Sequence, residues 1–390
     1  MNKLNLYFNK FRQSPLPFIL FIFIICRLIL LLAAWFSGYF LPNPSYQHFV
    51  DQGWFLSPHF LIDIWSRWDA EWYLNIVNNG YYVIDDIQST YSTVAFFPLF
   101  PLLVKVISLL VPKALLSQSM FLLIGLGVNN TLLVAALYFL YRFTDEFFHS
   151  EIFNKAIIVL FLAYPASFYF SCFYTESLFL FLSIFCLWAA KKGHWFRAAI
   201  FCGLLSITRP QGILMVLPIG ILLLQSMQWK LKNFPRSAFW LLLIPVPLLL
   251  YLTYMQALTG DFFAPITAQA AWGKETSNFK INFIDIFLTP EASVYKIDAV
   301  LSFIFIGLSI LSLFSLPSPA YGVFALLIIL MPVISGTTVS MTRYIAVAFP
   351  AFIALVKAVK KEILIYSVAA IFFAIQIFYF VGWVNYYWLA

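Results

Sequence analysis

Charged residues are scarce in this chain. Only 10% of its 390 residues are Asp, Glu, Lys or Arg, whereas 63% are hydrophobic, and the mean hydropathy is +0.91. Soluble globular domains carry about 25% charged residues, so this composition excludes that class. No polar stretch is long enough to fold separately, and we therefore expect one integral membrane domain over residues 1–390.

Cysteine is rarer still, with four residues in 390, and its spacing indicates no metal site. The four cysteines lie in apolar runs without any Cys-x-x-Cys pair, which is typical of small buried residues. The four histidines form no ligand cluster, and the sequence lacks a Gly-rich phosphate loop, Gly-x-Ser-x-Gly and His-Glu-x-x-His. We therefore expect no cofactor and a metal-independent protein.

The net charge of +7 comes from short basic clusters beside apolar runs. Such clusters are typical of the positive-inside bias of membrane proteins, which explains the charge better than nucleic-acid binding does. Four clusters are therefore expected on the cytoplasmic side: Lys3/Lys10/Arg12, Lys191/Lys192/Arg197, Lys230/Lys232/Arg236 and Lys357/Lys360/Lys361.

Apolar runs recur along the whole chain, each near the ~20 residues that cross a bilayer as a helix. The first run is too long for a signal-peptide core, so we expect it to be retained as a span. The basic clusters fit an all-α bundle of about eleven spans with the C-terminus outside, at about 17–40, 119–141, 156–172, 176–190, 197–208, 212–226, 238–258, 298–316, 320–339, 343–357 and 363–388.

This topology leaves two long outer loops, residues 41–118 and 259–297. Residues 98–111 are expected to lie along the outer interface as a short helix instead of crossing. If they cross, the later loops change sides and the positive-inside pattern breaks. Most acidic residues then lie on the outer side, which is where we expect any chemistry.

The first outer loop contains a polar stretch rich in tryptophan, residues 62–73. A helix over 65–73 would place Asp69 in one stripe with Trp65, Trp68 and Trp72. A carboxylate held against tryptophans would be partly desolvated and a stronger proton acceptor, so Asp69 is the candidate catalytic base. Alternatively, Asp69 caps the loop by bonding to backbone amides.

Further candidates lie around this acid and in three later segments. Arg67 and Glu71, four residues apart, can pair on the solvated side of the expected helix, although this order of charges is the weaker one. The candidate substrate-binding residues are Arg67, Trp68, Glu71, Trp72, Tyr73, Tyr174, Glu176, Arg209, Gln211, Arg343 and Tyr344.

Each later segment also has a structural interpretation. Glu176 either faces the cavity of Asp69 and orients a substrate hydroxyl, or only stabilises a helix start that Thr175 caps. The break Thr208–Gly212 either lines a protein cavity or is an interfacial turn whose Arg209 reaches the headgroups. Arg209 and Arg343 are isolated from the basic clusters, which favours a role as phosphate ligands. Arg27, inside the first span, is interpreted as structural.

Five pieces of the sequence, in order, resemble the phosphatidylinositol-glycan class V type mannosyltransferases, and in particular their shorter bacterial relatives. They span about three quarters of the chain: Arg67-Trp68-Asp69 with Trp72-Tyr73 and Gly80-Tyr81, Phe96-Phe97-Pro98-Leu99-Phe100-Pro101-Leu102-Leu103, Tyr164-Pro165-Ala166 with Tyr174-Thr175-Glu176-Ser177-Leu178-Phe179, Thr208-Arg209-Pro210-Gln211-Gly212, and Arg343-Tyr344.

The resemblance implies a C-class membrane glycosyltransferase with the catalytic acid and interfacial helices in its first outer loop. Such enzymes transfer a sugar with inversion from a polyprenyl- or dolichyl-phosphate donor. For class V relatives the sugar is mannose and the acceptor is a glycosylphosphatidylinositol precursor. In a bacterial-type relative the acceptor would be another glycolipid, glycan or protein. The expected location is the bacterial plasma membrane with an extracytoplasmic active site, or the endoplasmic reticulum membrane if the chain is eukaryotic.

Two other functions fit the same residues. A transporter or flippase of lipid-linked saccharide would also use aromatic clefts and isolated arginines, although transporters usually bind near the bilayer midplane in broken helices. A non-catalytic partner of a glycan polymerase is the third interpretation, and it should tolerate substitution of Asp69.

Overall fold

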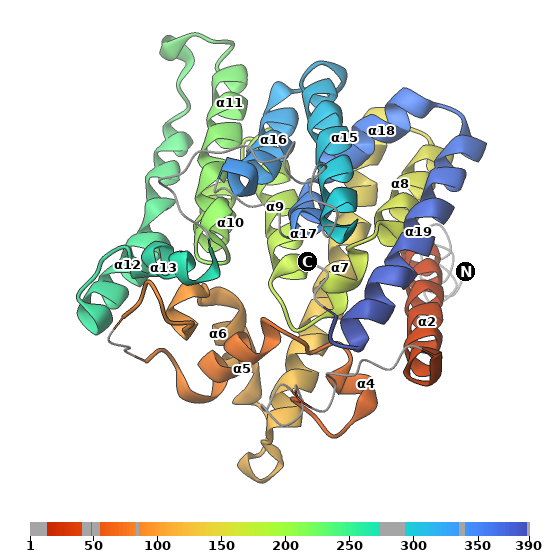
Figure 1. Cartoon of the computed structure of the whole chain (residues 1–390). Helices are drawn as coiled ribbons and strands as arrows, with labels where there is room; N and C mark the ends of the chain where they lie inside the picture. The colour runs from red at the N-terminus through yellow and green to blue at the C-terminus, as the bar shows by residue number, and fades with distance from the viewer. Residues whose placement is uncertain are drawn as a thin grey trace, which may run out of the picture.

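The structure is a computed structural model that describes residues 14–40, 48, 55–82, 86–273, 293–334 and 340–387. Within these ranges the regular elements are all helical, as the composition predicted (Figure 1). The basic cluster Lys3/Lys10/Arg12 and residues 274–292 of the second expected outer loop lie outside the described residues.

Most helices form one bundle. It contains α2 (Leu16–Phe40), α7 (Gln118–Phe148), α8 (Glu151–Ala163), α9 (Glu176–Lys191), α10 (Trp195–Ser206), α11 (Val216–Ser226), η6 (Arg236–Leu243) with α12 (Pro245–Thr259), α15 (Ser293–Ser315), α16 (Pro319–Ile334), α17 (Met341–Val347), α18 (Phe349–Val359) and α19 (Glu362–Val384).

Five helices of the described chain are long and apolar enough to cross a membrane, namely α2, α7, η6 with α12, α15 and α19. The pair α17 and α18, bent by 77°, makes six if it counts as one span. Three other expected spans, 197–208, 212–226 and 320–339, overlap shorter apolar helices. The chain is therefore a multi-pass membrane protein, and the count of eleven stays a prediction.

The described residues of the first expected outer loop, which we call the first loop, form short helices at one end of the bundle, the loop end (Figure 1). They are α4 (Phe60–Asp63), α5 (Ala70–Asn79), η1 (Thr93–Ala95), α6 (Leu99–Ser108) and η2 (Lys113–Leu115). Helix α6 has 10 residues and spans about 15 Å, half of the hydrocarbon core, so it is too short to cross as a helix.

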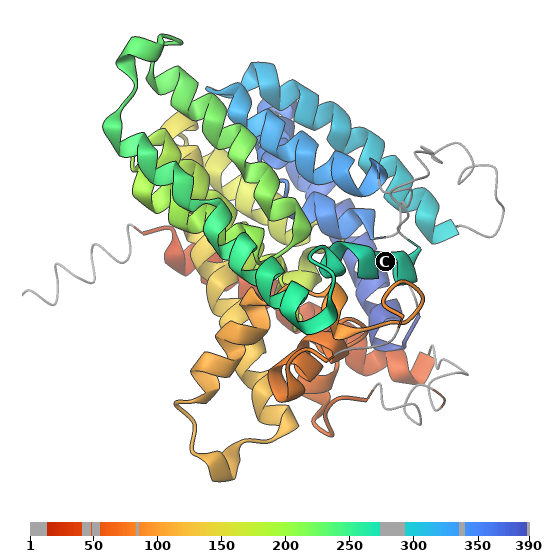
Figure 2. The same cartoon turned by 90° about the vertical axis from the view of Figure 1, so that its left-hand side faces the viewer.

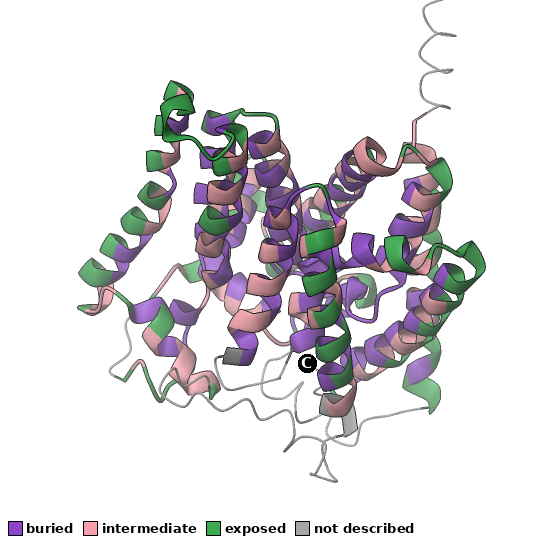
Figure 3. Cartoon of the chain, turned by 90° about the horizontal axis from the view of Figure 1, so that it is seen from above, coloured by how far each residue is buried: buried purple, intermediate pink, exposed green. Residues whose placement is uncertain are grey.

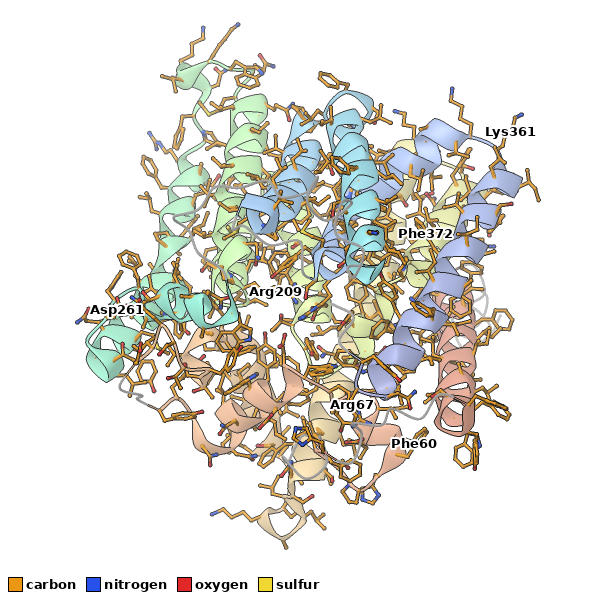
Figure 4. The ribbon with its side chains drawn as sticks, viewed as in Figure 1. Phe60, Arg67, Arg209, Asp261, Lys361 and Phe372 are labelled. Atoms are coloured by element: carbon orange, nitrogen blue, oxygen red, sulfur yellow. The ribbon has the colours of Figure 1, made fainter. Side chains whose placement is uncertain are left out.

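The opposite end carries basic turns. The turn after α11 and the turn between α18 and α19 both lie there in Figure 1, and Figure 4 shows Lys361 at that end. Phe60 and Arg67 lie at the loop end, with Arg209 at an intermediate height (Figure 4). Two of the expected cytoplasmic clusters are thus at the end opposite the first loop.

Burial separates the inside of the bundle from its outside (Figure 3). Helix α2 exposes Phe21, Leu28 and Trp35, which lie seven residues apart on one face and suit contact with lipid. Its buried Arg27 faces inward, where Nε donates to Ser171 Oγ at 2.7 Å and Nη2 donates to the Ser167 carbonyl at 2.9 Å. The structural interpretation of Arg27 is thereby supported.

Candidate active site

The segment around Asp69 is a turn, not the helix expected over 65–73. Helix α4 ends at Asp63 and α5 begins at Ala70, with Asp69 at its N-cap position. Trp68 has a φ of 54°, a left-handed conformation that a bulky residue adopts only when its surroundings enforce it. Its ring lies 6.1 Å from that of Tyr386, at right-angled geometry, so the end of the chain helps to hold this turn.

The turn separates the tryptophans that the expected helix would have aligned. Trp65 is buried against Phe380, with ring centroids 4.6 Å apart. Trp68 and Trp72 instead line a large cavity. The expected single stripe is therefore wrong, because only two of its three tryptophans accompany Asp69.

That cavity has a volume of about 870 Å³, large enough for a sugar with part of a lipid chain. Its walls come from the first loop, the break before α11, and α12, α16 and α17, together with α13 (Ala264–Thr267) and η7 (Ala268–Trp272). Figure 2 shows α12 and α13 in front of the first-loop helices. Eight predicted site residues line it: Trp68, Asp69, Trp72, Tyr73, Arg209, Gln211, Arg343 and Tyr344.

One wall of the cavity is aromatic. The rings of Trp72 and Phe96 are stacked at 5.9 Å, and Trp272 meets both edge-on at 5.9 and 5.5 Å. Tyr91 extends this wall at 4.8 Å from Trp272. Trp272 and Tyr91 were not among the predicted site residues, because neither lies in one of the five pieces that carry the family resemblance. Flat apolar faces of this kind suit stacking on a sugar ring or an isoprenoid chain.

Four charged side chains from separate segments meet at the cavity wall. Arg343 Nη1 lies 3.1 Å from Asp69 Oδ2, and its Nε and Nη2 lie 3.1 and 3.0 Å from Glu176 Oε1. Arg209 Nη2 pairs with the same oxygen of Glu176. Two carboxylates and two guanidinium groups thus form one network without net formal charge.

Glu176 lies behind this network and does not line the cavity. Its side chain is 0% exposed, compared with 21% for Asp69 and 13% for Arg343. The expectation that Glu176 orients a substrate hydroxyl from within the cavity is therefore wrong, because both arginines cover it. Its neighbour Thr175 makes no side-chain cap, since its hydroxyl accepts from Arg209 Nε at 2.6 Å.

Arg67 is buried away from the cavity, and its expected pair with Glu71 is wrong. It forms a buried ion pair with Asp63, four residues earlier, and donates to Tyr386 Oη at 2.7 Å. Glu71 is half-buried and outside the lining, and burial raises the pKa of its carboxyl group.

Tyr174 also lies behind the cavity wall, where it connects the loop to the charged network. Its hydroxyl accepts from the backbone nitrogen of Asp69 at 3.0 Å and donates to the carbonyl of Arg67 at 3.0 Å. The Arg343 guanidinium lies 4.6 Å from its ring centroid, and 4.9 Å from that of Tyr169. These are cation–π distances, so both tyrosines help to fix Arg343.

The polar break before α11 lines the cavity instead of forming a simple interfacial turn. Thr208, Arg209, Pro210 and Gln211 are all in the lining, and 3₁₀-helix η4 (Pro210–Met215) follows. Gly212 is required here because a Cβ atom would collide with the carbonyl of Leu205 at the end of α10. Close backbone contact therefore places Arg209 at the cavity.

Tyr73 adds a neutral hydroxyl to the lining. Burial raises the pKa of this phenol well above its ordinary value, so it stays protonated and can donate a hydrogen bond at neutral pH. Among the described residues, no three His, Cys, Asp or Glu side chains are arranged to hold a metal ion. The cationic groups available in the lining are the two arginines.

Comparison with known proteins gives two matches. The family model described as mannosyltransferase (PIG-V) matches residues 18–264, which is more than half of the chain. GPI mannosyltransferase 2 of Drosophila pseudoobscura pseudoobscura is 32% identical over 125 residues, which cover 30% of this chain and 25% of that relative. The chain thus spans about a quarter of the curated relative's length. The family match includes Asp69, Glu176 and Arg209 and ends before Arg343, and on this match the chain belongs to the PIG-V mannosyltransferase family.

Proposed function

We propose that this protein is a membrane mannosyltransferase with a polyprenyl-phosphate-linked donor. The acceptor would be a hydroxyl group of a glycolipid, glycan or protein, and the reaction would proceed on the extracytoplasmic face with inversion at the anomeric carbon. The observation that carries this proposal is the pairing of Asp69 with Arg343 at the wall of an aromatic cavity of about 870 Å³. Membership of the family supports mannose as the sugar.

In the proposed reaction, Asp69 takes the proton from the acceptor hydroxyl as that oxygen bonds to the anomeric carbon. The bond between this carbon and the phosphate oxygen breaks, and its electron pair stays on the phosphate. Polyprenyl phosphate then carries one more negative charge than it did within the donor. Arg343 and Arg209, which both line the cavity with Asp69, would stabilise this charge.

The transfer reaction itself tests the proposal. Purified protein with a polyprenyl-phosphate mannose donor and a hydroxyl acceptor should release polyprenyl phosphate and form a mannosylated product. A transporter would instead move intact donor across a vesicle membrane without releasing its phosphate. Observation of movement without product would therefore replace the proposed activity with the transport alternative.

Asp69→Asn tests the role of the base. It should lower the transfer rate by about 10² to 10⁴-fold, the usual contribution of a positioned base. Asp86→Asn is the matched control, because Asp86 is exposed in the same loop and, among the described residues, its hydrogen bonds come from its neighbours Gln88 and Ser89. Near-full transfer by Asp69→Asn would exclude Asp69 as the base. Absence of transfer by the wild-type protein on its own would instead favour the scaffold alternative.

A further inference from the structure

The ion pair between Asp69 and Arg343 joins the proposed base to the proposed phosphate ligand. Asp69 Oδ2 accepts from Arg343 Nη1 at 3.1 Å. This oxygen of Asp69 is therefore occupied by an ion pair and is not available to a substrate hydroxyl. The same guanidinium is the group that the phosphate of the proposed donor requires.

Arg343 can change this partner without losing its position. Its Nε and Nη2 both donate to Glu176 Oε1, on the side away from Asp69. Tyr169 and Tyr174 contact the guanidinium through their rings. Glu176 is 0% exposed whereas Asp69 is 21% exposed, so a ligand in the cavity reaches Asp69 and leaves Glu176 covered.

Arg209 supplies a second donor beside the first. Its Nε and Nη2 bond to Thr175 and Glu176, while Nη1 has no hydrogen-bond partner in the described part of the chain. Both guanidinium groups contact the same carboxylate oxygen, so they are adjacent. Asp69 is negatively charged and pairs with Arg343, so it repels an anion that approaches the two arginines.

We infer that the donor phosphate competes with Asp69 for Arg343, so that donor binding frees Asp69 to act as the base. This inference rests on the proposed function. In this inference Asp69 has a second role, because its carboxylate competes with the lipid phosphate for Arg343. The phosphate takes the place of the carboxylate at the arginine pair, and the Asp69 oxygen that Arg343 occupies becomes free for the acceptor hydroxyl only when the donor is present.

The inference predicts that the inactive variant binds lipid phosphate more tightly. A short polyprenyl monophosphate, titrated into the full-length protein in detergent, serves as the probe, with inorganic phosphate as a second probe that lacks the lipid. Asp69→Asn should bind the polyprenyl phosphate about tenfold more tightly than the wild type, which corresponds to about 1.4 kcal/mol. Inorganic phosphate should bind more weakly to both proteins but show the same direction of change.

Three further variants make the result decisive. Asp69→Ala should reproduce the tighter binding of polyprenyl phosphate. Arg343→Gln should bind polyprenyl phosphate more weakly than the wild type, because it removes the cation. Asp86→Asn should bind it as the wild type does, because Asp86 bonds to its neighbour Gln88 and does not pair with Arg343. Equal or weaker binding by folded Asp69→Asn and Asp69→Ala would overturn the competition. Failure of the wild type to bind polyprenyl phosphate would instead overturn the donor class of the proposed function, and the competition with it.

Discussion

The Tyr174 hydroxyl oxygen lies 3.0 Å from the backbone nitrogen of Asp69, from which it accepts a hydrogen bond. The same hydroxyl donates to the Arg67 carbonyl, and the Tyr174 ring supports Arg343. One buried side chain thus sets the position of the proposed base relative to the cation that pairs with it. This arrangement makes Tyr174 a positioning residue and not a substrate ligand.

Tyr174→Phe should slow the reaction while it leaves donor binding in place. The ring remains beside Arg343, but Asp69 and Arg67 each lose a backbone hydrogen bond, and a misplaced base raises the barrier. We expect kcat to fall about tenfold with KM for the donor little changed, which is about 1.4 kcal/mol of barrier. Steady-state kinetics with the polyprenyl-phosphate donor measure both constants.

Tyr164→Phe is the matched control for this variant. The Tyr164 hydroxyl is also buried, but it has no hydrogen-bond partner among the described residues. Its removal should leave the kinetics unchanged. If both variants lost activity equally, the effect would reflect loss of a buried hydroxyl in general and not the connection to Asp69.

Glu176→Gln should destabilise the protein and abolish transfer. Glu176 is buried and holds both arginines through one oxygen, so a neutral amide leaves Arg209 without its carboxylate and Arg343 with Asp69 alone. Breaking a buried pair typically costs about 3–5 kcal/mol. Thermal unfolding in detergent measures the loss of stability, and the transfer assay measures the loss of activity.

Glu146→Gln tests whether the burial of Glu176 explains the expected loss of stability. Glu146 also pairs with two cations, Lys191 and Lys192, but its side chain is 27% exposed. Pairs in contact with solvent contribute only about 0–1 kcal/mol. A loss of stability as large as that of Glu176→Gln would contradict the special role given to the buried carboxylate.

The sequence was sufficient to find the segments that meet at the site. Asp69, Arg209 and Arg343 stand out as charges in apolar or aromatic surroundings, and such charges are costly unless they line a cavity or find partners. All three line the same cavity. The helical class followed from composition, but span number did not, because several apolar helices are shorter than a full crossing.

Predictions from the spacing of neighbouring residues were wrong where contacts between distant segments decide which partner a residue takes. Asp63 and Glu71 both lie four residues from Arg67, and burial against Tyr386 selects Asp63. The left-handed Trp68 interrupts a stretch whose periodicity favoured a helix. Glu176 was expected in the cavity, but two arginines from distant segments cover it. None of these contacts is visible in the spacing of neighbouring residues.

Gly212→Ala should displace the break that carries Arg209. A Cβ atom at this position would overlap the Leu205 carbonyl, and the backbone of η4 must move to avoid it. We expect a lower melting temperature and weaker binding of polyprenyl phosphate. Gly220→Ala in α11 is the control, since nothing lies within 4 Å of its Cβ. That change should stabilise the helix by up to about 1 kcal/mol. Equal melting temperatures for both variants would contradict the packing role of Gly212.

Metal removal should leave the proposed reaction unchanged. In the proposed reaction the leaving phosphate lies beside the two arginines of the cavity, and Glu176 holds both of them. Fixed cations at that place perform the electrostatic work otherwise given to a divalent ion. Transfer rates measured after treatment with EDTA should therefore equal those of untreated protein, and added Mg²⁺ should not raise them. Arg343→Gln should be inactive under both conditions. If EDTA stopped transfer by the wild type and Mg²⁺ restored it, the leaving phosphate would depend on a metal ion and not on Arg209 and Arg343 alone.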